Sequence, residues 1–126
     1  MKRPTILIAD DDPTILIAIS SRLENEGYRV FTTQDGYQAL AIARREQPDL
    51  MILDIHMPAG SGVSVQQRIK AIEEFTVPSV IYITGKEITE DTVEQVHRQA
   101  ARIIKKPFDT GELLATVSES LAASAA

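Results

Sequence analysis

Residues 50–54 read LMILD, a continuous apolar run that is closed by the carboxylate of Asp54. Four apolar residues in succession are typical of a strand buried on both faces of a parallel sheet, because a solvated face would carry a polar residue at every second position. An unpaired carboxylate is rarely placed in such a core. Asp54 therefore marks the point at which the strand leaves the core, and it is the first candidate functional residue.

Short apolar runs alternate with amphipathic stretches on both sides of this strand. Apolar runs predict strands, and apolar residues spaced three or four apart predict helices. The predicted strands are residues 5–9, 28–32, 50–53, 78–83 and 102–104, and the predicted helices start at or near residues 13, 35, 63, 93 and 109. This rhythm of five β-α units favours a parallel sheet with helices on both faces.

Bulk composition narrows the class of protein. The chain has 126 residues, and 44% are hydrophobic and 25% charged, as in one ordinary globular domain. A net charge of −5 argues against a nucleic-acid-binding surface, and the absence of cysteine excludes disulfides and thiolate metal sites. No apolar run is long enough to span a bilayer, and the first four residues lead straight into a strand, so we expect a cytoplasmic location.

Polar side chains follow four of the five predicted strands. In an open α/β sheet, ligands bind beyond the carboxyl ends of the strands, so these side chains are expected at one edge. They are Asp10 and Asp11 after the first strand, Asp54 after the third, Thr84 after the fourth, where Gly85 is the next residue, and Lys106 after the fifth. The signal at Asp54 is the strongest, and the others are weak alone, since acids often cap helices and lysines are usually solvated. The conjunction is much more specific than any one of these residues.

The chemistry of this set points to phosphoryl transfer. Carboxylates that converge repel each other unless a cation lies between them. Hard oxygen ligands without histidine or cysteine suit Mg²⁺. A divalent cation, a lysine and a hydroxyl are what a transferring phosphoryl group requires, because its charge spreads over three oxygens. A carboxylate can itself be the nucleophile and form an acyl phosphate.

The chain resembles the receiver domain of the bacterial two-component response regulators. The matching segments are ILIADDDP at residues 6–13, LMILDIHMPAGSG at 50–62, SVIYITG at 79–85 and IIKKPF at 103–108. The resemblance covers Ile6 to about Leu121. It implies a single doubly wound (βα)5 flavodoxin-like α/β domain with a five-stranded parallel sheet of order 2-1-3-4-5. We expect this domain to occupy residues 1–121, followed by an alanine-rich tail or linker start at 122–126.

The resemblance also implies a role for individual residues. The implied phosphoryl acceptor is Asp54, and the implied Mg²⁺ (or Mn²⁺) ligands are Asp10, Asp11, Asp54 and the backbone carbonyl of His56. The implied phosphoryl-binding and switch residues are Thr84, Gly85 and Lys106, and Ile103 stands at the switch partner position. His56 and Lys86 stand at the positions that tune the lifetime of the phosphoryl group. A cis peptide is implied at Lys106–Pro107.

The implied function is a signalling switch and not a conventional enzyme. A sensor histidine kinase or phosphotransfer protein would donate the phosphoryl group, and the domain would later remove it by autodephosphorylation. The surface of the fourth helix, fifth strand and fifth helix would change and control a downstream effector protein or domain. We expect no direct contact with nucleic acid or membrane, and a monomer or weak homodimer.

The sequence departs from the family pattern at the switch partner position. Ile103 stands where the family usually has an aromatic residue, three positions before the lysine. An isoleucine cannot make the ring rotation that the family couples to the switch threonine. The route by which a signal leaves the site is therefore left open by the sequence.

Two other functions fit parts of the sequence. Asp10, Asp12 and Thr14 match the Asp-x-Asp-x-Thr motif of haloacid-dehalogenase-like phosphohydrolases, in which Asp10 would be the nucleophile. That interpretation leaves Asp54 unexplained. The second alternative is a pseudo-receiver that is never phosphorylated and acts only as an interaction module, but such proteins usually lose an acid or the lysine. Asp12 is also a candidate helix cap, because it directly precedes a proline-initiated helix.

Overall fold

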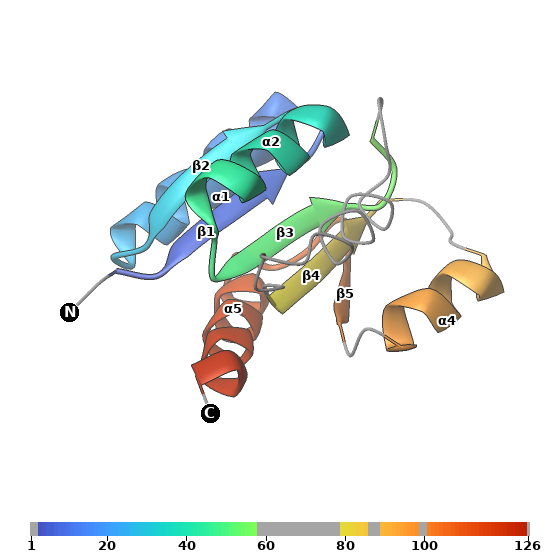
Figure 1. Cartoon of the computed structure of the whole chain (residues 1–126). Helices are drawn as coiled ribbons and strands as arrows, with labels where there is room; N and C mark the ends of the chain where they lie inside the picture. The colour runs from blue at the N-terminus through green and yellow to red at the C-terminus, as the bar shows by residue number, and fades with distance from the viewer. Residues whose placement is uncertain (1–2, 58–78, 86–88, 99–100, 126) are drawn as a thin grey trace.

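The computed structural model describes residues 3–57, 79–85, 89–98 and 101–125 of the chain. Its five strands are all parallel and lie in the order β2-β1-β3-β4-β5 (Figure 1). The strands are β1 Thr5–Ala9, β2 Arg29–Thr33, β3 Leu50–Asp54, β4 Ser79–Thr84 and β5 Arg102–Lys105. The predicted α/β class and the order 2-1-3-4-5 are confirmed. The helix predicted at residues 63–75 lies outside the described residues.

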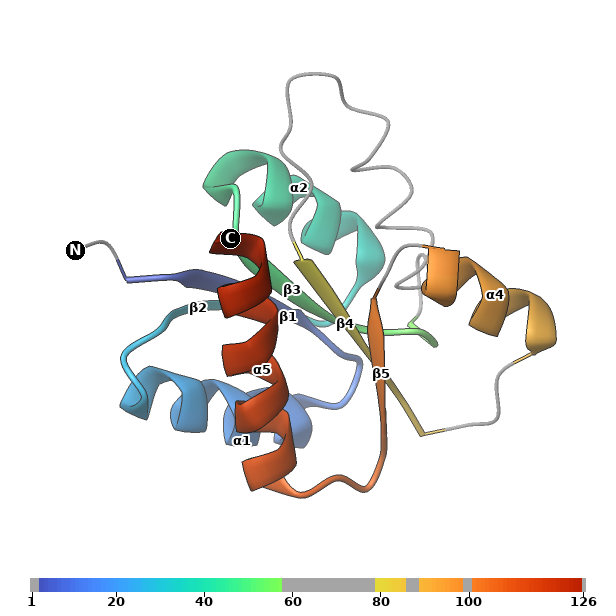
Figure 2. The same cartoon turned by 90° about the horizontal axis from the view of Figure 1, so that it is seen from below.

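Helices cover both faces of the sheet. The described helices are α1 Pro13–Asn25, α2 Gly36–Glu46, α4 Glu90–Arg98 and α5 Thr110–Ala125. Figure 2 shows the sheet from below, with α5 nearer to the viewer than α2. No helix in the described part of the chain is both long enough and apolar enough to cross a membrane.

Two apolar clusters form the core, one on each face. The α1–α5 cluster contains buried side chains of α1 and α5 together with Ile6, Ile8, Leu50, Ile52, Ile81, Ile83 and Ile104 of the strands. The α2–α4 cluster contains buried side chains of α2 and α4 together with Leu7, Ala9, Met51, Leu53, Val80 and Tyr82 of the strands. Successive residues of a strand point to opposite faces, so β1, β3 and β4 need apolar residues at consecutive positions. All five residues of β3 are buried, as the LMIL run predicts.

Side-chain caps set where the helices begin. Asp12 precedes α1, and its carboxylate accepts a hydrogen bond of 2.9 Å from the Thr14 N–H. Asp35 precedes α2, and its carboxylate accepts one of 2.7 Å from the Gln38 N–H. Each cap satisfies an N–H that has no partner inside the helix. Both predicted helix starts are confirmed.

Several predicted details differ from the structure. The second strand begins one residue later than predicted, and β3 includes Asp54. On α1, Leu16 is buried while Ile15 is only partly buried. The fifth helix continues beyond Leu121 to Ala125, in keeping with the high helix propensity of alanine.

The packing of the central strand generates a stability prediction. Ile52 of β3 is fully buried in the α1–α5 cluster, so Ile52→Ala should lower the free energy of unfolding by about 2–5 kcal/mol. The matched control is Ile17→Ala on α1, where 68% of the side chain is exposed and the change should stay within about 0.5 kcal/mol. Urea unfolding followed by circular dichroism measures both. Equal losses in the two variants would contradict the assignment of β3 as the centre of the core.

Candidate functional site

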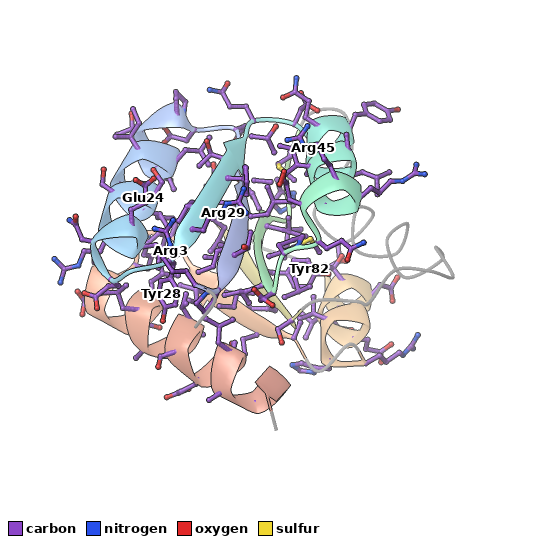
Figure 3. The ribbon with its side chains drawn as sticks, turned by 60° about the vertical axis from the view of Figure 1, so that its left-hand side comes forward. Arg3, Glu24, Tyr28, Arg29, Arg45 and Tyr82 are labelled. Carbon is purple, nitrogen blue, oxygen red and sulfur yellow. The ribbon has the colours of Figure 1, made fainter. Side chains whose placement is uncertain are left out.

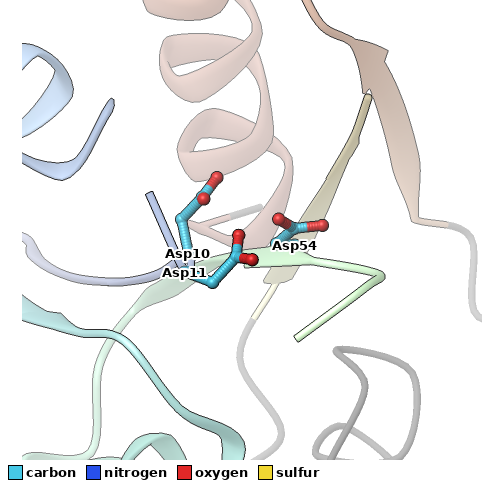
Figure 4. Close-up of side chains that lie close together, drawn as sticks. All are labelled: Asp10, Asp11 and Asp54. Atoms are coloured by element: carbon cyan, nitrogen blue, oxygen red, sulfur yellow. The ribbon is translucent and has the colours of Figure 1, made fainter. Parts of the chain in front are cut away.

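The carboxyl ends of β1 and β3 bring three carboxylates together (Figure 4). Asp10 and Asp11 directly follow β1, and Asp54 is the last residue of β3. Each of the three offers an oxygen that lies within 4.8 Å of the others. Asp10 is fully buried and Asp54 is 3% exposed, whereas Asp11 is exposed. Two buried acids and one solvated acid therefore share one small space.

Lys106, directly after β5, supplies a positive charge to this cluster. Its Nζ lies 2.8 Å from Asp10 Oδ2 and 3.1 Å from Asp54 Oδ2. The contact with Asp54 has the geometry of a hydrogen bond. The lysine side chain is 17% exposed, so both ion pairs are largely screened from water. A buried cation held against two carboxylates is a strong local interaction, because the effective dielectric is low.

Backbone N–H groups orient both buried carboxylates. The Asp12 N–H donates to Asp10 Oδ1 at 2.9 Å, and the His56 N–H donates to Asp54 Oδ1 at 2.9 Å. In each case the donor lies two residues after the acid, which is the geometry of an Asx turn. The Oδ2 atoms are then the ones that meet Lys106.

One buried oxygen of the cluster is poorly satisfied. Asp10 Oδ2 accepts no hydrogen bond of good geometry within the described part of the chain. Lys106 Nζ is within ion-pair distance, so the approach is close but its angle is unfavourable for a hydrogen bond. Burial raises the pKa of Asp10, and the neighbouring lysine offsets this only in part. Asp10 therefore carries a charge that a second cation would stabilise.

The same contacts act on the lysine. Burial lowers the pKa of Lys106, but the ion pairs with Asp10 and Asp54 outweigh it, and the net shift is upward. Lys106 is therefore protonated at neutral pH, and its charge is available to an anion that arrives at Asp54.

The donor set fits a hard divalent cation. Three carboxylates from two strand ends, one of them solvent-accessible and one with an unsatisfied oxygen, are suitable ligands for Mg²⁺ or Mn²⁺. Magnesium usually binds through one or two carboxylates and keeps several waters, and the exposure of Asp11 leaves a side of the site open to them. The residues that would hold the ion are Asp10, Asp11 and Asp54.

The structure also locates the other predicted site residues. Thr84 ends β4 and is 1% exposed, and Gly85 follows it. His56 has an exposed side chain, Ile103 is partly buried on β5, and the Lys106–Pro107 peptide is cis. Lys86 lies outside the described residues.

One contribution of Gly85 was not visible in the sequence. A Cβ placed on this residue would lie 3.4 Å from Lys106 Cδ, in van der Waals contact with the lysine side chain. The lysine stem therefore passes beside the end of β4. This contact depends on the pairing of β4 with β5, where Thr84 lies opposite Lys105, and no local signal in the sequence reveals it.

The chain is similar in sequence to a known protein family and to several curated proteins. The response regulator receiver domain family matches residues 6–118. Among curated proteins, the chain is 33% identical to the protein PilH of Pseudomonas aeruginosa, over 93% of this chain and 97% of PilH. It is 38% identical to the DNA-binding dual master transcriptional regulator RpaA of Synechocystis, over 90% of this chain but only 47% of RpaA. The chain thus spans about half the length of some curated relatives and nearly all of another.

The fold is also similar to solved structures of receiver domains. A CheY-like response regulator receiver domain protein from Methanospirillum hungatei superimposes with a TM-score of 0.85 at 29% identity, covering 98% of this chain and 97% of that one. The signal receiver domain of a LuxO repressor protein from Vibrio parahaemolyticus superimposes with a TM-score of 0.87 at 26% identity, covering 98% and 93%. The sequence match over most of the chain shows that this protein belongs to the response regulator receiver domain family.

Proposed function

We propose that this domain is a phosphorylation-dependent signalling switch in which Asp54 accepts the phosphoryl group. The observation that carries the proposal is the contact of Lys106 Nζ with both Asp10 and Asp54. This contact supports a site in which a phosphoryl group on Asp54 would lie beside the ammonium group of Lys106. Membership of the receiver family supports the same assignment, since the family is a signalling domain used in phosphorelays.

The proposed reaction is a transfer between a histidine and an aspartate. An oxygen of the Asp54 carboxylate attacks phosphorus, the bond from phosphorus to the imidazole nitrogen of the donor breaks, and the imidazole keeps the electron pair. The product is an acyl phosphate on Asp54, which water later hydrolyses to the carboxylate and inorganic phosphate. Lys106 offsets charge on the phosphoryl oxygens throughout, because its ammonium remains protonated.

A bound Mg²⁺ or Mn²⁺, held by Asp10, Asp11, Asp54 and the His56 backbone carbonyl, would supply further neutralisation of phosphoryl charge. The proposal gives Thr84 and Gly85 the phosphoryl-binding role beside Lys106. It gives His56 and Lys86 control over access of the hydrolytic water.

The proposed partners follow from this chemistry. A sensor histidine kinase or phosphotransfer protein donates the phosphoryl group in the cytoplasm, and a downstream effector protein or domain responds to the surface of α4, β5 and α5. Only a few kcal/mol of bias between two conformations is needed to shift their populations. The proposal includes no direct contact with nucleic acid or membrane, and a monomer or weak homodimer.

Chemical labelling tests the identity of the acceptor. With Mg²⁺ and acetyl phosphate, mass spectrometry of the intact protein and its peptides should find one phosphoryl group at Asp54, and Asp54→Asn should abolish it. The control is Asp35→Asn, which should react like the wild type, because asparagine caps α2 as well as aspartate does. Turnover through a phosphoryl group on Asp10 would instead support the phosphohydrolase, and no labelling at all would support the pseudo-receiver.

Removal of the lysine charge tests its catalytic role. Lys106→Met keeps the apolar stem but leaves the transferring group without its cation, so the rate of phosphorylation by acetyl phosphate should fall on the order of 10²-fold. Lys105→Met is the matched control, because Lys105 is exposed and has no ion pair among the described residues. Rates are measured by the accumulation of phosphoprotein under saturating Mg²⁺. An unchanged rate in Lys106→Met would refute the proposed role.

The raised pKa of Asp10 predicts how metal binding depends on pH. Below its pKa the carboxyl group is neutral and gives no anionic ligand, and burial moves that pKa upward. Mg²⁺ affinity should therefore decrease on acidification at a pH above the ordinary aspartate range near 4. Calorimetric titration over a pH series measures it, and Asp10→Asn should bind weakly with a shallower pH dependence. Wild-type affinity that stays constant down to about pH 4 would contradict this.

A further inference from the structure

The alternation of the strands separates the site into two parts. On β1, β3 and β5 the even-numbered residues belong to the α1–α5 cluster, and Asp10, Asp54 and Lys106 continue that phase. On β4 the phase is opposite, and its even-numbered residues Val80 and Tyr82 belong to the α2–α4 cluster. By this alternation Thr84 falls on the face of the α2–α4 cluster, which α4 covers. The charged groups thus belong to one face of the sheet and the Thr84 hydroxyl to the other.

Tyr82 lies two residues before Thr84 on that same face. It is fully buried and is the largest such side chain among the described residues. In the sheet its Cα pairs with Leu53 of β3 on one side and Ile103 of β5 on the other. Figure 3 shows Tyr82 on the α4 side of the molecule and Tyr28 on the α1–α5 side. An aromatic ring thus occupies the position next to Ile103, one strand away.

Few of the described side chains of α4 are buried against this part of the core. Val96 is its one buried side chain among those described, and it belongs to the same cluster as Tyr82. Val93 and Thr92 are partly buried, while the other described side chains of α4 are exposed. Among the described side chains of α4, Val96 is thus the main contact with the core, and the position of the helix is sensitive to the shape of the surface beneath Val96.

We infer that Tyr82 is the residue that transmits the state of the site to α4, in place of the aromatic missing at position 103. The inference rests on the proposed function. When Thr84 is drawn toward a phosphoryl group on Asp54, the end of β4 moves, and the ring two residues earlier moves with it. The ring shifts the surface on which Val96 sits, and α4 changes position.

The rigidity of the Tyr82 ring makes it suitable for passing a displacement of β4 on to α4. A tyrosine ring is planar and has only two rotatable side-chain bonds, so a displaced ring displaces its neighbours. An aliphatic side chain of similar volume can absorb the same displacement by changing rotamer. Close-packed interiors convert small shifts into discrete changes of packing only where the side chains do not yield. Tyr82 is therefore a positioning residue for the readout and takes no part in the chemistry.

Hydrogen exchange of the α4 amides tests this role. Each protein is measured with and without Mg²⁺ and beryllofluoride, while mass spectrometry after acetyl phosphate treatment reports modification of Asp54. In the wild type, exchange in residues 90–98 should change on activation. In Tyr82→Leu, Asp54 should still be modified, but the change in α4 exchange should fall about fivefold or more, the size of a lost allosteric coupling. Tyr82→Phe keeps the ring and should keep the response.

A matched control and a second variant make the test decisive. Tyr28→Leu makes the same change at a partly buried tyrosine that packs against the α1–α5 cluster, and it should leave the α4 response intact. If Tyr82→Leu does not fold, Tyr82→Met replaces it, since methionine fills irregular space. A full α4 response in a folded Tyr82→Leu or Tyr82→Met variant overturns the inference, as does loss of the response in Tyr82→Phe. Failure of the wild type to be modified at Asp54 refutes the proposed function instead.

Discussion

The ion pairs of Lys106 are the interaction on which this structure depends most. Two buried carboxylates that meet at the edge of a sheet would destabilise the fold if nothing offset their repulsion. Lys106 Nζ lies within 3.1 Å of an oxygen of each, and so links the ends of β1, β3 and β5. Removal of that charge would leave uncompensated buried anions, which is a costly defect. The constraint that holds the sheet edge together is therefore the same one that, in the proposed function, places a cation beside the phosphoryl group on Asp54.

The charged site and the proposed readout lie on opposite faces of one sheet. The acids and the lysine continue the phase of the α1–α5 cluster, whereas Thr84 continues the phase of the α2–α4 cluster through Tyr82. This division follows from the two-residue period of strands and from the opposite phase of β4. Ion pairs and backbone hydrogen bonds fix the charged centre over one face, while the proposed transmission through Tyr82 lies on the other.

Much of the fold was predictable from local signals. The LMIL run predicted a strand buried on both faces, and all of β3 is buried. Asp12 predicted the start of α1, because a capping side chain acts on N–H groups only two or three residues away. Boundaries were less predictable. The extent of α5 to Ala125 reflects the high helix propensity of alanine, which apolar periodicity does not detect.

The sequence by itself determined the β-α order and which residue types follow each strand, because both are properties of neighbouring residues. Only the tertiary structure decided how those residues meet. Lys106 lies close to Asp10 and Asp54 only because β1, β3 and β5, which are far apart in the chain, end at the same edge of the sheet. The unsatisfied Asp10 Oδ2 and the contact of Gly85 with the lysine stem depend on the same assembly of strands. The phase of each strand relative to the helices is likewise a property of the assembled sheet, since a shift of one residue would send every side chain to the other face. For that reason the sequence showed that position 103 lacks an aromatic, and the structure showed that Tyr82 lies beside it.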